Sequence, residues 1–265
     1  MEQTLILALV FLVVSTLFSM LGLGGGALYV PILLFAGFSM SSAPSISLIL
    51  IAATSLAALS HFSKKNKVDW KLALVIDPPT DVMAFVGGYF STRVAEPILR
   101  SILIGVLMVA GTLMLKNRQK TLLPREQNEH WWLWHREFHG ERYRVNLPLV
   151  LTATALIGIL AGMLGITGGI IKLPIMVLLC GVPMDIAVAT STVMVAVTAL
   201  SGIAGHAMQG QVDWRTGLIL AGVAVIGGLI GSRISGSMNK ARLKKWFGVA
   251  VWIIAVRMAI QLMIK

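Results

Sequence analysis

Three charged side chains interrupt long apolar stretches of this 265-residue chain: Lys172, Asp77 and Asp81. A lysine deep in a stretch that crosses a membrane is costly and usually functional, so Lys172 is a candidate contact for an anion. The competing interpretation is a structural ion pair, in which one of the two aspartates neutralises the lysine.

The two aspartates lie one helical turn apart, on either side of Pro78-Pro79. A carboxyl group held away from water can keep a proton at physiological pH, so both are proton-coupling candidates. Asp81 lies further from the preceding basic residues and is expected to be the deeper of the two. Asp77 is expected nearer the membrane surface, where water would hydrate it.

Two glycine clusters precede short apolar segments, each with a proline at the same offset. Their members are Gly24, Gly25 and Gly26 in the first cluster and Thr167, Gly168 and Gly169 in the second. Glycine lets the backbone turn tightly and present its N–H groups, and a helix that starts there aims its positive end at the same place. Such a place attracts anions. Alternatively, the glycines only allow close packing of helices.

Hydroxyl groups near the clusters offer further substrate ligands. Tyr29 occupies the position in the first half that corresponds to Lys172 in the second, while Ser47, Thr190 and Ser191 follow the clusters at matched distances. Helical serine and threonine often bond their own backbone instead, and the sequence leaves both interpretations open.

Two arginines, Arg93 and Arg233, end apolar segments at matched positions. They are candidate gate or anion-recruiting groups. The alternative is that each side chain extends along the bilayer to the lipid headgroups.

The composition indicates what must position these groups. Hydrophobic residues make up 57% of the chain and charged residues 12%, against about 25% charged in soluble domains. Apolar runs of about 20 residues fit the hydrocarbon core of a bilayer, and they lack the alternation of barrel strands. We therefore expect an all-α integral membrane protein in the lipid bilayer.

The formal charge of +11 does not indicate nucleic acid binding, because the basic residues gather in short loops between apolar segments, as in membrane proteins generally. Neither His-Glu-x-x-His nor Gly-x-Ser-x-Gly occurs, which argues against a membrane protease. We therefore expect that the protein is not an enzyme and that it needs no cofactor. We also expect no metal site, since His135 and His139 alone are a weak metal signal.

The chain is an internal duplication with four matched landmarks: the glycine clusters, the prolines that follow them, two Val-Asp-Trp loops and two Gly-Gly pairs. The predicted divisions are a first membrane repeat at 1–115, a linker at 116–146 and a second membrane repeat at 147–265. Each repeat is predicted to be a glycine-tipped helical hairpin, whose short second limb is re-entrant or spanning, plus three transmembrane helices. The predicted segments are 4–21, 27–38, 43–61, 72–92 and 97–115, then 147–164, 170–181, 185–206, 216–234 and 247–264.

Five segments per half would reverse the orientation of the second half in the membrane. The loops agree with this, because a loop rich in basic residues in one half matches a loop poor in them in the other. Basic loops are retained on the inner side of membranes, which places 62–71, 116–146 and 236–246 inside and both termini outside a bacterial inner membrane. Aromatic and basic residues interleave at 130–139, and we expect an amphipathic helix on the inner surface there.

These motifs resemble those of the sulfite exporter TauE/SafE family over nearly the whole chain. The resemblance implies a secondary transporter, an exporter of small sulfur-containing anions such as sulfite, thiosulfate or sulfonates. Ile166-Thr167 replaces a full glycine run in the second cluster, and the stretch from Asp77 to Asp81 is more polar than the family pattern.

Inverted repeats with short interrupted helices point to a binding site near the middle of the membrane. The hypothesis is proton-coupled alternating access, with the anion held between the two glycine tips. A passive anion channel is the main alternative, and an integral-membrane enzyme a weaker one. Apolar faces would also permit a homodimer.

Overall fold

The computed structural model describes residues 2–24, 26–115, 131–166, 168–235 and 240–264. Most of these residues are helical, which confirms the expected α-helical membrane fold. The first half contains α1 (Glu2–Met20), α2 (Gly26–Phe35), α3 (Ala43–Lys64), α4 (Trp70–Ile76), α5 (Pro78–Phe90), the short 3-10 helix η1 (Ser91–Arg93) and α6 (Glu96–Leu115). The second half contains α7 (Leu147–Leu164), α8 (Gly169–Leu178), α9 (Met184–Met208), α10 (Trp214–Ile234) and α11 (Lys240–Ile264). Between them lies a β hairpin of β1 (Leu133–Phe138) and β2 (Glu141–Asn146).

Six of the described helices are long and apolar enough to cross a membrane: α3, α6, α7, α9, α10 and α11. The described apolar parts of α1, α2 and α8 are shorter. The glycine turns separate α1 from α2 and α7 from α8, as the sequence predicts. The helix that follows each turn, α2 or α8, has 10 residues. At 1.5 Å per residue, such a helix covers only about half of a bilayer core.

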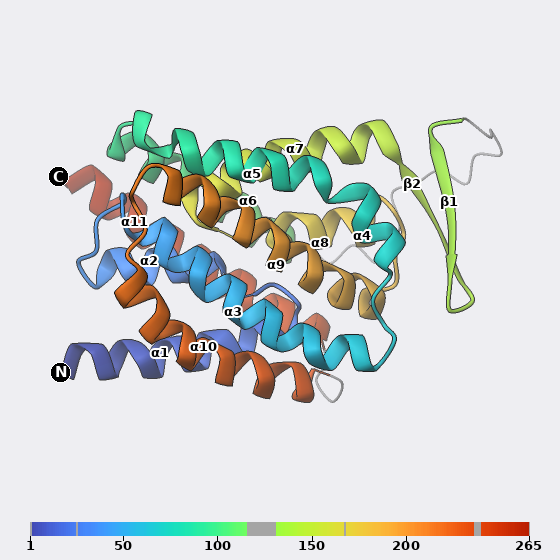
Figure 1. Cartoon of the computed structure of the whole chain (residues 1–265), viewed down its shortest axis with the longest axis horizontal. Helices are drawn as coiled ribbons and strands as arrows, with labels where there is room; N and C mark the ends of the chain where they lie inside the picture. The colour runs from blue at the N-terminus through green and yellow to red at the C-terminus, as the bar shows by residue number, and fades with distance from the viewer. Residues whose placement is uncertain (1, 25, 116–130, 167, 236–239, 265) are drawn as a thin grey trace.

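The helices run largely along the long axis of the molecule (Figure 1), and we name its two ends. Both termini lie at one end, the termini end, and the β hairpin lies at the other, the β-hairpin end. Helix α1 starts at the termini end, whereas α7 follows β2 and starts at the β-hairpin end. The two glycine turns are thus reached from opposite ends of the molecule.

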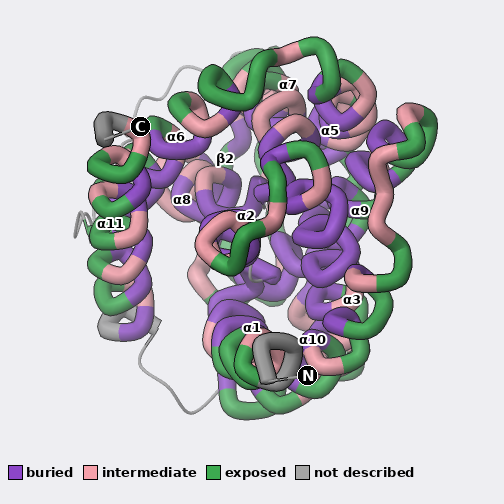
Figure 2. The backbone as a smooth tube through the Cα atoms, turned by 90° about the vertical axis from the view of Figure 1, so that its left-hand side faces the viewer, coloured by how far each residue is buried: buried purple, intermediate pink, exposed green. Residues whose placement is uncertain are grey.

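Helices α3 and α9 form the centre of the bundle. In their most apolar 18-residue windows, 72% and 83% of residues are buried, against 28% in α11, and Figure 2 shows buried backbone toward the middle and exposed backbone outside. Around this centre α1 packs on α10 and α7 packs on α5, while α6 pairs with α11. Each half thus supplies the helix that covers the fourth segment of the other half.

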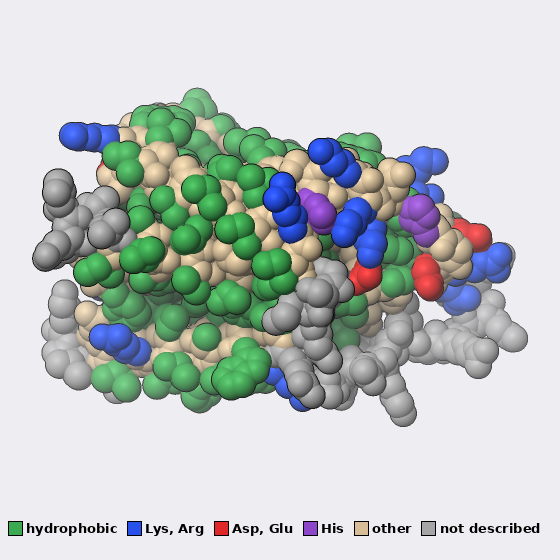
Figure 3. Space-filling model, turned by 90° about the horizontal axis from the view of Figure 1, so that it is seen from below, with side chains coloured by type: hydrophobic (Ala, Val, Ile, Leu, Met, Phe, Trp, Pro, Cys, Tyr) green, Lys and Arg blue, Asp and Glu red, His purple; other side chains and the backbone are tan. Residues whose placement is uncertain are grey.

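The surface divides along the same axis. Figure 3 shows a face covered mainly by hydrophobic side chains, with Lys, Arg, His and acidic side chains gathered toward the right, which is the β-hairpin end. Single exposed apolar residues are ordinary, but a continuous apolar surface needs a partner, and lipid is the partner that suits a bundle of membrane-length helices.

The fourth segment of the first half, predicted as one span over 72–92, is instead two helices that meet at Asp77. Pro78 and Pro79 begin α5, and proline has no N–H to continue a helical ladder. Asp77 therefore ends α4 and precedes α5, while the matching α10 is unbroken.

The amphipathic helix predicted at 130–139 is wrong, because residues from Leu133 onward form the β hairpin; residue 130 lies outside the described part of the chain. Along β1, burial alternates from Trp134 to Phe138, with His135 and Glu137 exposed. That is the two-residue period of a strand. The turn at His139 and Gly140, with φ of 52° and 79°, supplies the two positive φ values that a tight hairpin connection requires.

Candidate functional site

The first glycine turn, between α1 and α2, is called the first tip, and the turn between α7 and α8 the second tip. Gly22 and Gly24 have φ of 65° and 63°, and Gly165 has φ of 65°, a left-handed conformation that favours glycine. Space is also short: a Cβ atom at Gly22 would lie 2.2 Å from the carbonyl oxygen of Val188, and one at Gly165 would lie 2.3 Å from Cα of Pro44.

The two tips touch each other. A Cβ atom at Gly169 would lie 3.7 Å from Cα of Leu23 in the first tip and 2.7 Å from Cγ2 of Val195. The other methyl of Val195 would lie 2.9 Å from a Cβ atom at Gly24. The predicted glycines therefore gather at one place beside α9, where the tips are closed on each other. Gly26 begins α2 and Gly168 directly precedes α8, while Gly25 and Thr167 lie outside the described residues.

Ser47 and Ser191 hold these tips. Oγ of Ser47 donates a hydrogen bond to the carbonyl oxygen of Gly165 at 2.5 Å, and Oγ of Ser191 donates to that of Gly22 at 3.0 Å. Both hydroxyls are buried. Both serines give their single hydrogen to backbone oxygens, and Ser191 shares its hydrogen between Gly22 and Val188, the latter also at 3.0 Å.

Lys172 lies one turn into α8 and is 1% exposed. Its Nζ forms an ion pair with Asp77 and donates a hydrogen bond to Oγ1 of Thr198 at 3.0 Å. Thr198 in turn donates to Oδ1 of Asp81 at 2.8 Å. Four side chains, from α8, α9, the α4–α5 joint and α5, thus form one connected polar cluster, which we call the Lys172 cluster.

The expectation that Asp77 stays hydrated is wrong, since its side chain is 6% exposed and paired with Lys172. Asp81 is the more exposed of the two carboxylates. The reason is the break at Pro78, which places Asp77 at the joint of two helices, against α8. With both carboxylates ionised, the Lys172 cluster carries one negative charge, and one added proton makes it neutral.

Thr198 is the member of this cluster that the sequence analysis missed. It lies seven residues after Ser191, and its counterpart Thr54 lies seven residues after Ser47. Seven residues is close to two helical turns, so each pair shares a helix face. The recurrence of a hydroxyl at that spacing in both halves is the sequence signal that could have indicated Thr198.

Tyr29 and Thr54 form the corresponding contact in the first half. The tyrosine hydroxyl lies 3.1 Å from Oγ1 of Thr54, its ring packs edge-on against Phe11, and all of it is buried. Helices α2 and α3 thus make, in the first half, an uncharged version of the contact that Lys172 makes with Thr198.

Thr190 and the two arginines lie elsewhere. Oγ1 of Thr190 accepts a hydrogen bond from the N–H of Asp69 at 3.0 Å, toward the β-hairpin end. Arg93 stacks over the ring of Phe90, 4.8 Å from its centroid, and Arg233 is exposed at the end of α10. The Thr190 side chain thus contacts Asp69 and not the first tip, although Thr190 is next to Ser191, and the two arginines lie at the ends of their segments.

Asp69 anchors the β hairpin to the bundle. Its buried carboxylate accepts two hydrogen bonds from Arg136, both at 2.9 Å, one from the hydroxyl of Tyr143 and one from the N–H of Leu72. Burial alone would raise the pKa of Asp69, but these hydrogen bonds outweigh it and hold that pKa below its ordinary value. We call this contact the Asp69 clamp.

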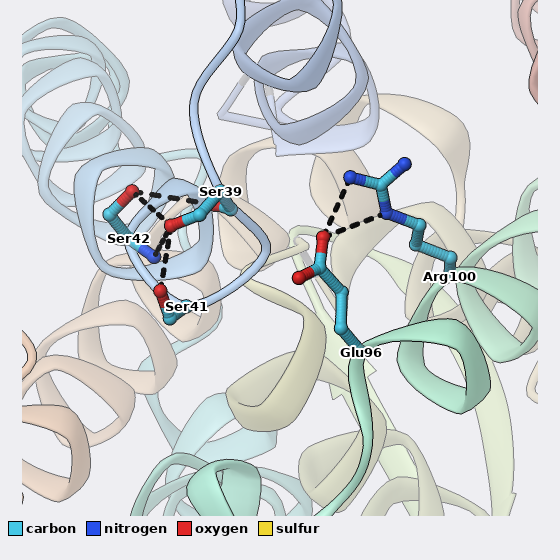
Figure 4. Close-up of polar contacts among 5 residues, drawn as sticks. All are labelled: Ser39, Ser41, Ser42, Glu96 and Arg100. Carbon is cyan, nitrogen blue, oxygen red and sulfur yellow. Dashed lines mark hydrogen bonds and ion pairs between the residues drawn. The ribbon is translucent and has the colours of Figure 1, made fainter.

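At the termini end, a cavity of about 100 Å3 lies between the α2–α3 loop and the start of α6, with Ser41, Ser91, Glu96 and Gln211 in its lining. Figure 4 shows the serines of the loop bonded to one another and Arg100 folded back on Glu96. Arg100 donates two hydrogen bonds to Oε1 of Glu96, at 2.7 and 3.0 Å. Ser91 also contacts Nδ1 of the buried His206 at 3.4 Å. Met40, Val94 and Leu99 also line the cavity, which is therefore partly polar and partly apolar. It lies where α5 and α9 end.

Ionisable groups buried between membrane-length helices, beside short limbs that start at glycine breaks, are typical of membrane transporters, and that is the class of this protein. The chain belongs to the sulfite exporter TauE/SafE family, whose profile matches residues 7–258.

Relatives with named roles agree with this class. The chain is 28% identical to the probable membrane transporter protein YunE of Bacillus subtilis over 88% of this chain and 89% of that protein. It is 24% identical to the probable membrane transporter protein YfcA of Escherichia coli K12, over 91% and 82% of the two chains. MJ0441 of Methanocaldococcus jannaschii, another probable membrane transporter protein, is 24% identical over 76% of this chain and 71% of its own length. No solved structure matches the chain.

Proposed function

We propose that this protein is a proton-coupled secondary transporter that exports small sulfur-containing anions such as sulfite, thiosulfate or sulfonates. The observation that carries the proposal is the Lys172 cluster, a buried cation held with two carboxylates directly behind the second tip. The family supports an anion of this class. The anion binds where the two tips now touch, which requires the tips to separate.

Coupling follows from the charge of the cluster. An anion placed near Lys172 is repelled by two ionised aspartates and less so when Asp81 carries a proton. Because a ligand shifts a conformational equilibrium only through its different affinity for the two states, protonation of Asp81 changes which conformation accepts the anion. Asp77 stays ionised and orients Lys172.

The membrane arrangement proposed is two inverted repeats, 1–115 and 147–265, in a bacterial inner membrane. The opposite starting ends of α1 and α7 support it, as does the basic β-hairpin end, which positive charge assigns to the cytoplasm. The test is to replace Cys180, introduce single cysteines at Ser39 or Lys245, and add an impermeant maleimide to whole cells. Labelling of the first position alone is expected, and the reverse pattern would overturn the orientation.

The transport test is uptake of radiolabelled sulfite into proteoliposomes with and without a pH gradient, with thiosulfate, a sulfonate and sulfate as competitors. Saturable, gradient-dependent uptake is expected for the wild type and for the control Lys245→Met, which removes an exposed cation. Lys172→Met is expected to lose uptake at least tenfold, and Asp81→Asn is expected to lose the pH dependence.

The channel alternative is judged in the same vesicles. Conductance that does not saturate and ignores the pH gradient would identify a passive anion channel. No uptake of any of these anions would rule out the proposed class of substrate.

A further inference from the structure

We propose that Thr198 is a positioning residue that transmits the protonation state of Asp81 to the Lys172–Asp77 ion pair. The inference rests on the proposed proton-coupled function. It names the residue that connects the proton site, Asp81, with the buried cation, Lys172. Thr198 is 3% exposed and bridges the two, at 3.0 Å from Nζ of Lys172 and 2.8 Å from Oδ1 of Asp81.

The direction of these hydrogen bonds is fixed by chemistry. A lysine ammonium group only donates, and a threonine hydroxyl has a single hydrogen to give. The contact with Lys172 must therefore use the threonine oxygen as acceptor, which leaves its one hydrogen for the carboxylate of Asp81. Lys172 therefore donates to Thr198, and Thr198 donates to Asp81, for as long as Asp81 is ionised.

A proton on the bonded oxygen of Asp81 reverses the second step. Asp81 then donates to Thr198, whose oxygen accepts from two sides and whose hydrogen must turn to another acceptor. The first half of the chain shows which one: Thr54 donates to the carbonyl oxygen of Leu50, four residues earlier, at 2.7 Å. Rotation to the equivalent carbonyl of Met194 weakens the hold of Thr198 on Lys172.

Few other groups can influence this switch. Among the residues that the structure describes, the charged groups that face Asp81 are Asp77, from the joint before α5, and Lys172, from α8. Helix α7, which packs on α5, contains no titratable residue, and the titratable residues of α9, Asp185 and His206, lie near its two ends.

The test uses Thr198→Val, which keeps the shape and removes the hydroxyl, and Thr198→Ala as a second variant without it. Thr198→Ser keeps the hydroxyl, and Thr54→Val is the matched control in the other half. In purified protein, infrared absorption of protonated carboxyl groups is followed across pH, and the Asp81 signal is identified as the one missing from Asp81→Asn.

The Asp81 midpoint is expected to move to higher pH by about one unit in Thr198→Val and Thr198→Ala, because a charge-assisted hydrogen bond is worth about that much. Thr198→Ser and Thr54→Val are expected to keep the wild-type midpoint. In proteoliposomes, the first two variants should also lose the pH dependence of sulfite uptake.

The two proposals fail separately. Identical midpoints in wild type and both hydroxyl-free variants would overturn the role of Thr198, even where transport is proton-coupled. A wild type that transports none of the anions, together with a shifted midpoint in Thr198→Val, would overturn the transport proposal and support the link between Thr198 and Asp81. A shift of the same size in Thr54→Val would make the effect a general packing response and overturn the role.

Discussion

Ser47 and Ser191 each hold the glycine tip of the other half of the chain. Ser47, on α3, donates to Gly165 in the second tip, and Ser191, on α9, donates to Gly22 in the first. The two serines occupy matching positions of the internal repeat, so the same contact is made twice with the halves exchanged. Each tip therefore depends on the central helix of the opposite repeat.

Loss of either hydroxyl should destabilise the protein. Ser47→Ala and Ser191→Ala each leave a buried carbonyl without its donor, which costs about 1–3 kcal/mol. Thermal unfolding in detergent is the measurement. Ser60→Ala serves as the control, because that exposed hydroxyl bonds only to its own helix at Ala57, and it should change the free energy of unfolding by less than about 0.5 kcal/mol. Equal losses in all three variants would contradict the exchanged contact.

Alanine at the tip glycines is expected to be worse than alanine at an open glycine of the same conformation. Gly22 and Gly165 combine positive φ with close backbone neighbours, whereas Gly210 has a φ of 67° and open space around it. The left-handed backbone conformation costs an alanine about 1–2 kcal/mol at each of the three positions. Crowding adds roughly 1–3 kcal/mol at Gly22 and Gly165. If Gly210→Ala lowers the unfolding temperature as much as Gly22→Ala, the tips are less crowded than their contacts indicate.

The Asp69 clamp should fix the β hairpin. Asp69→Asn removes the charge that Arg136 binds with two hydrogen bonds, and breaking such a buried pair costs about 3 kcal/mol. Limited trypsin digestion should then cut at Arg142 and Arg144 at least tenfold faster. Asp213→Asn is the matched control, since Asp213 caps α10 through Thr216 and occupies the corresponding place in the repeat. Unchanged digestion of Asp69→Asn would show that apolar contacts hold the hairpin alone.

The clamp also defines a pH window. The pKa of Asp69 is lowered from its ordinary 3.8, so its contribution is full above that value and disappears as pH falls through the lower folded value. Burial and the hydrogen bond to Asp69 raise the pKa of Tyr143 above its ordinary 10.0, so its contribution is full below 10.0 and disappears as pH rises through the higher folded value.

Amide exchange of residues 133–146, corrected for intrinsic rates, is expected to stay constant between about pH 4 and pH 10 and to accelerate outside that range. Asp69→Asn should lack the acidic limit. Acceleration near neutral pH in the wild type would contradict the assignment.

The sequence predicts the fold well where chemistry is repeated. The glycine clusters and their prolines recur at the same spacing, and the serines after them at a spacing that differs by one residue, so both tips and their surroundings follow from the pattern. Asp77 was misjudged because its burial depends on a helix break and on where α8 packs, and distance along a segment carries neither. The β hairpin was missed because interleaved aromatic and basic residues fit both a helix face and a strand, and only the alternation of burial and the turn at Gly140 separate them.

Each half of the chain supplies the helix that packs on the fourth segment of the other half, and this has a consequence for biosynthesis. Helix α1 packs on α10, and about 200 residues separate the end of one from the start of the other. At ribosomal rates of about 5–20 residues per second, α1 waits roughly 10–40 s for its partner. During that interval the surface of α1 that will contact α10 is exposed to lipid, insertion factors and proteases. We therefore expect protection of the unfinished first half to influence how much of this protein accumulates in cells.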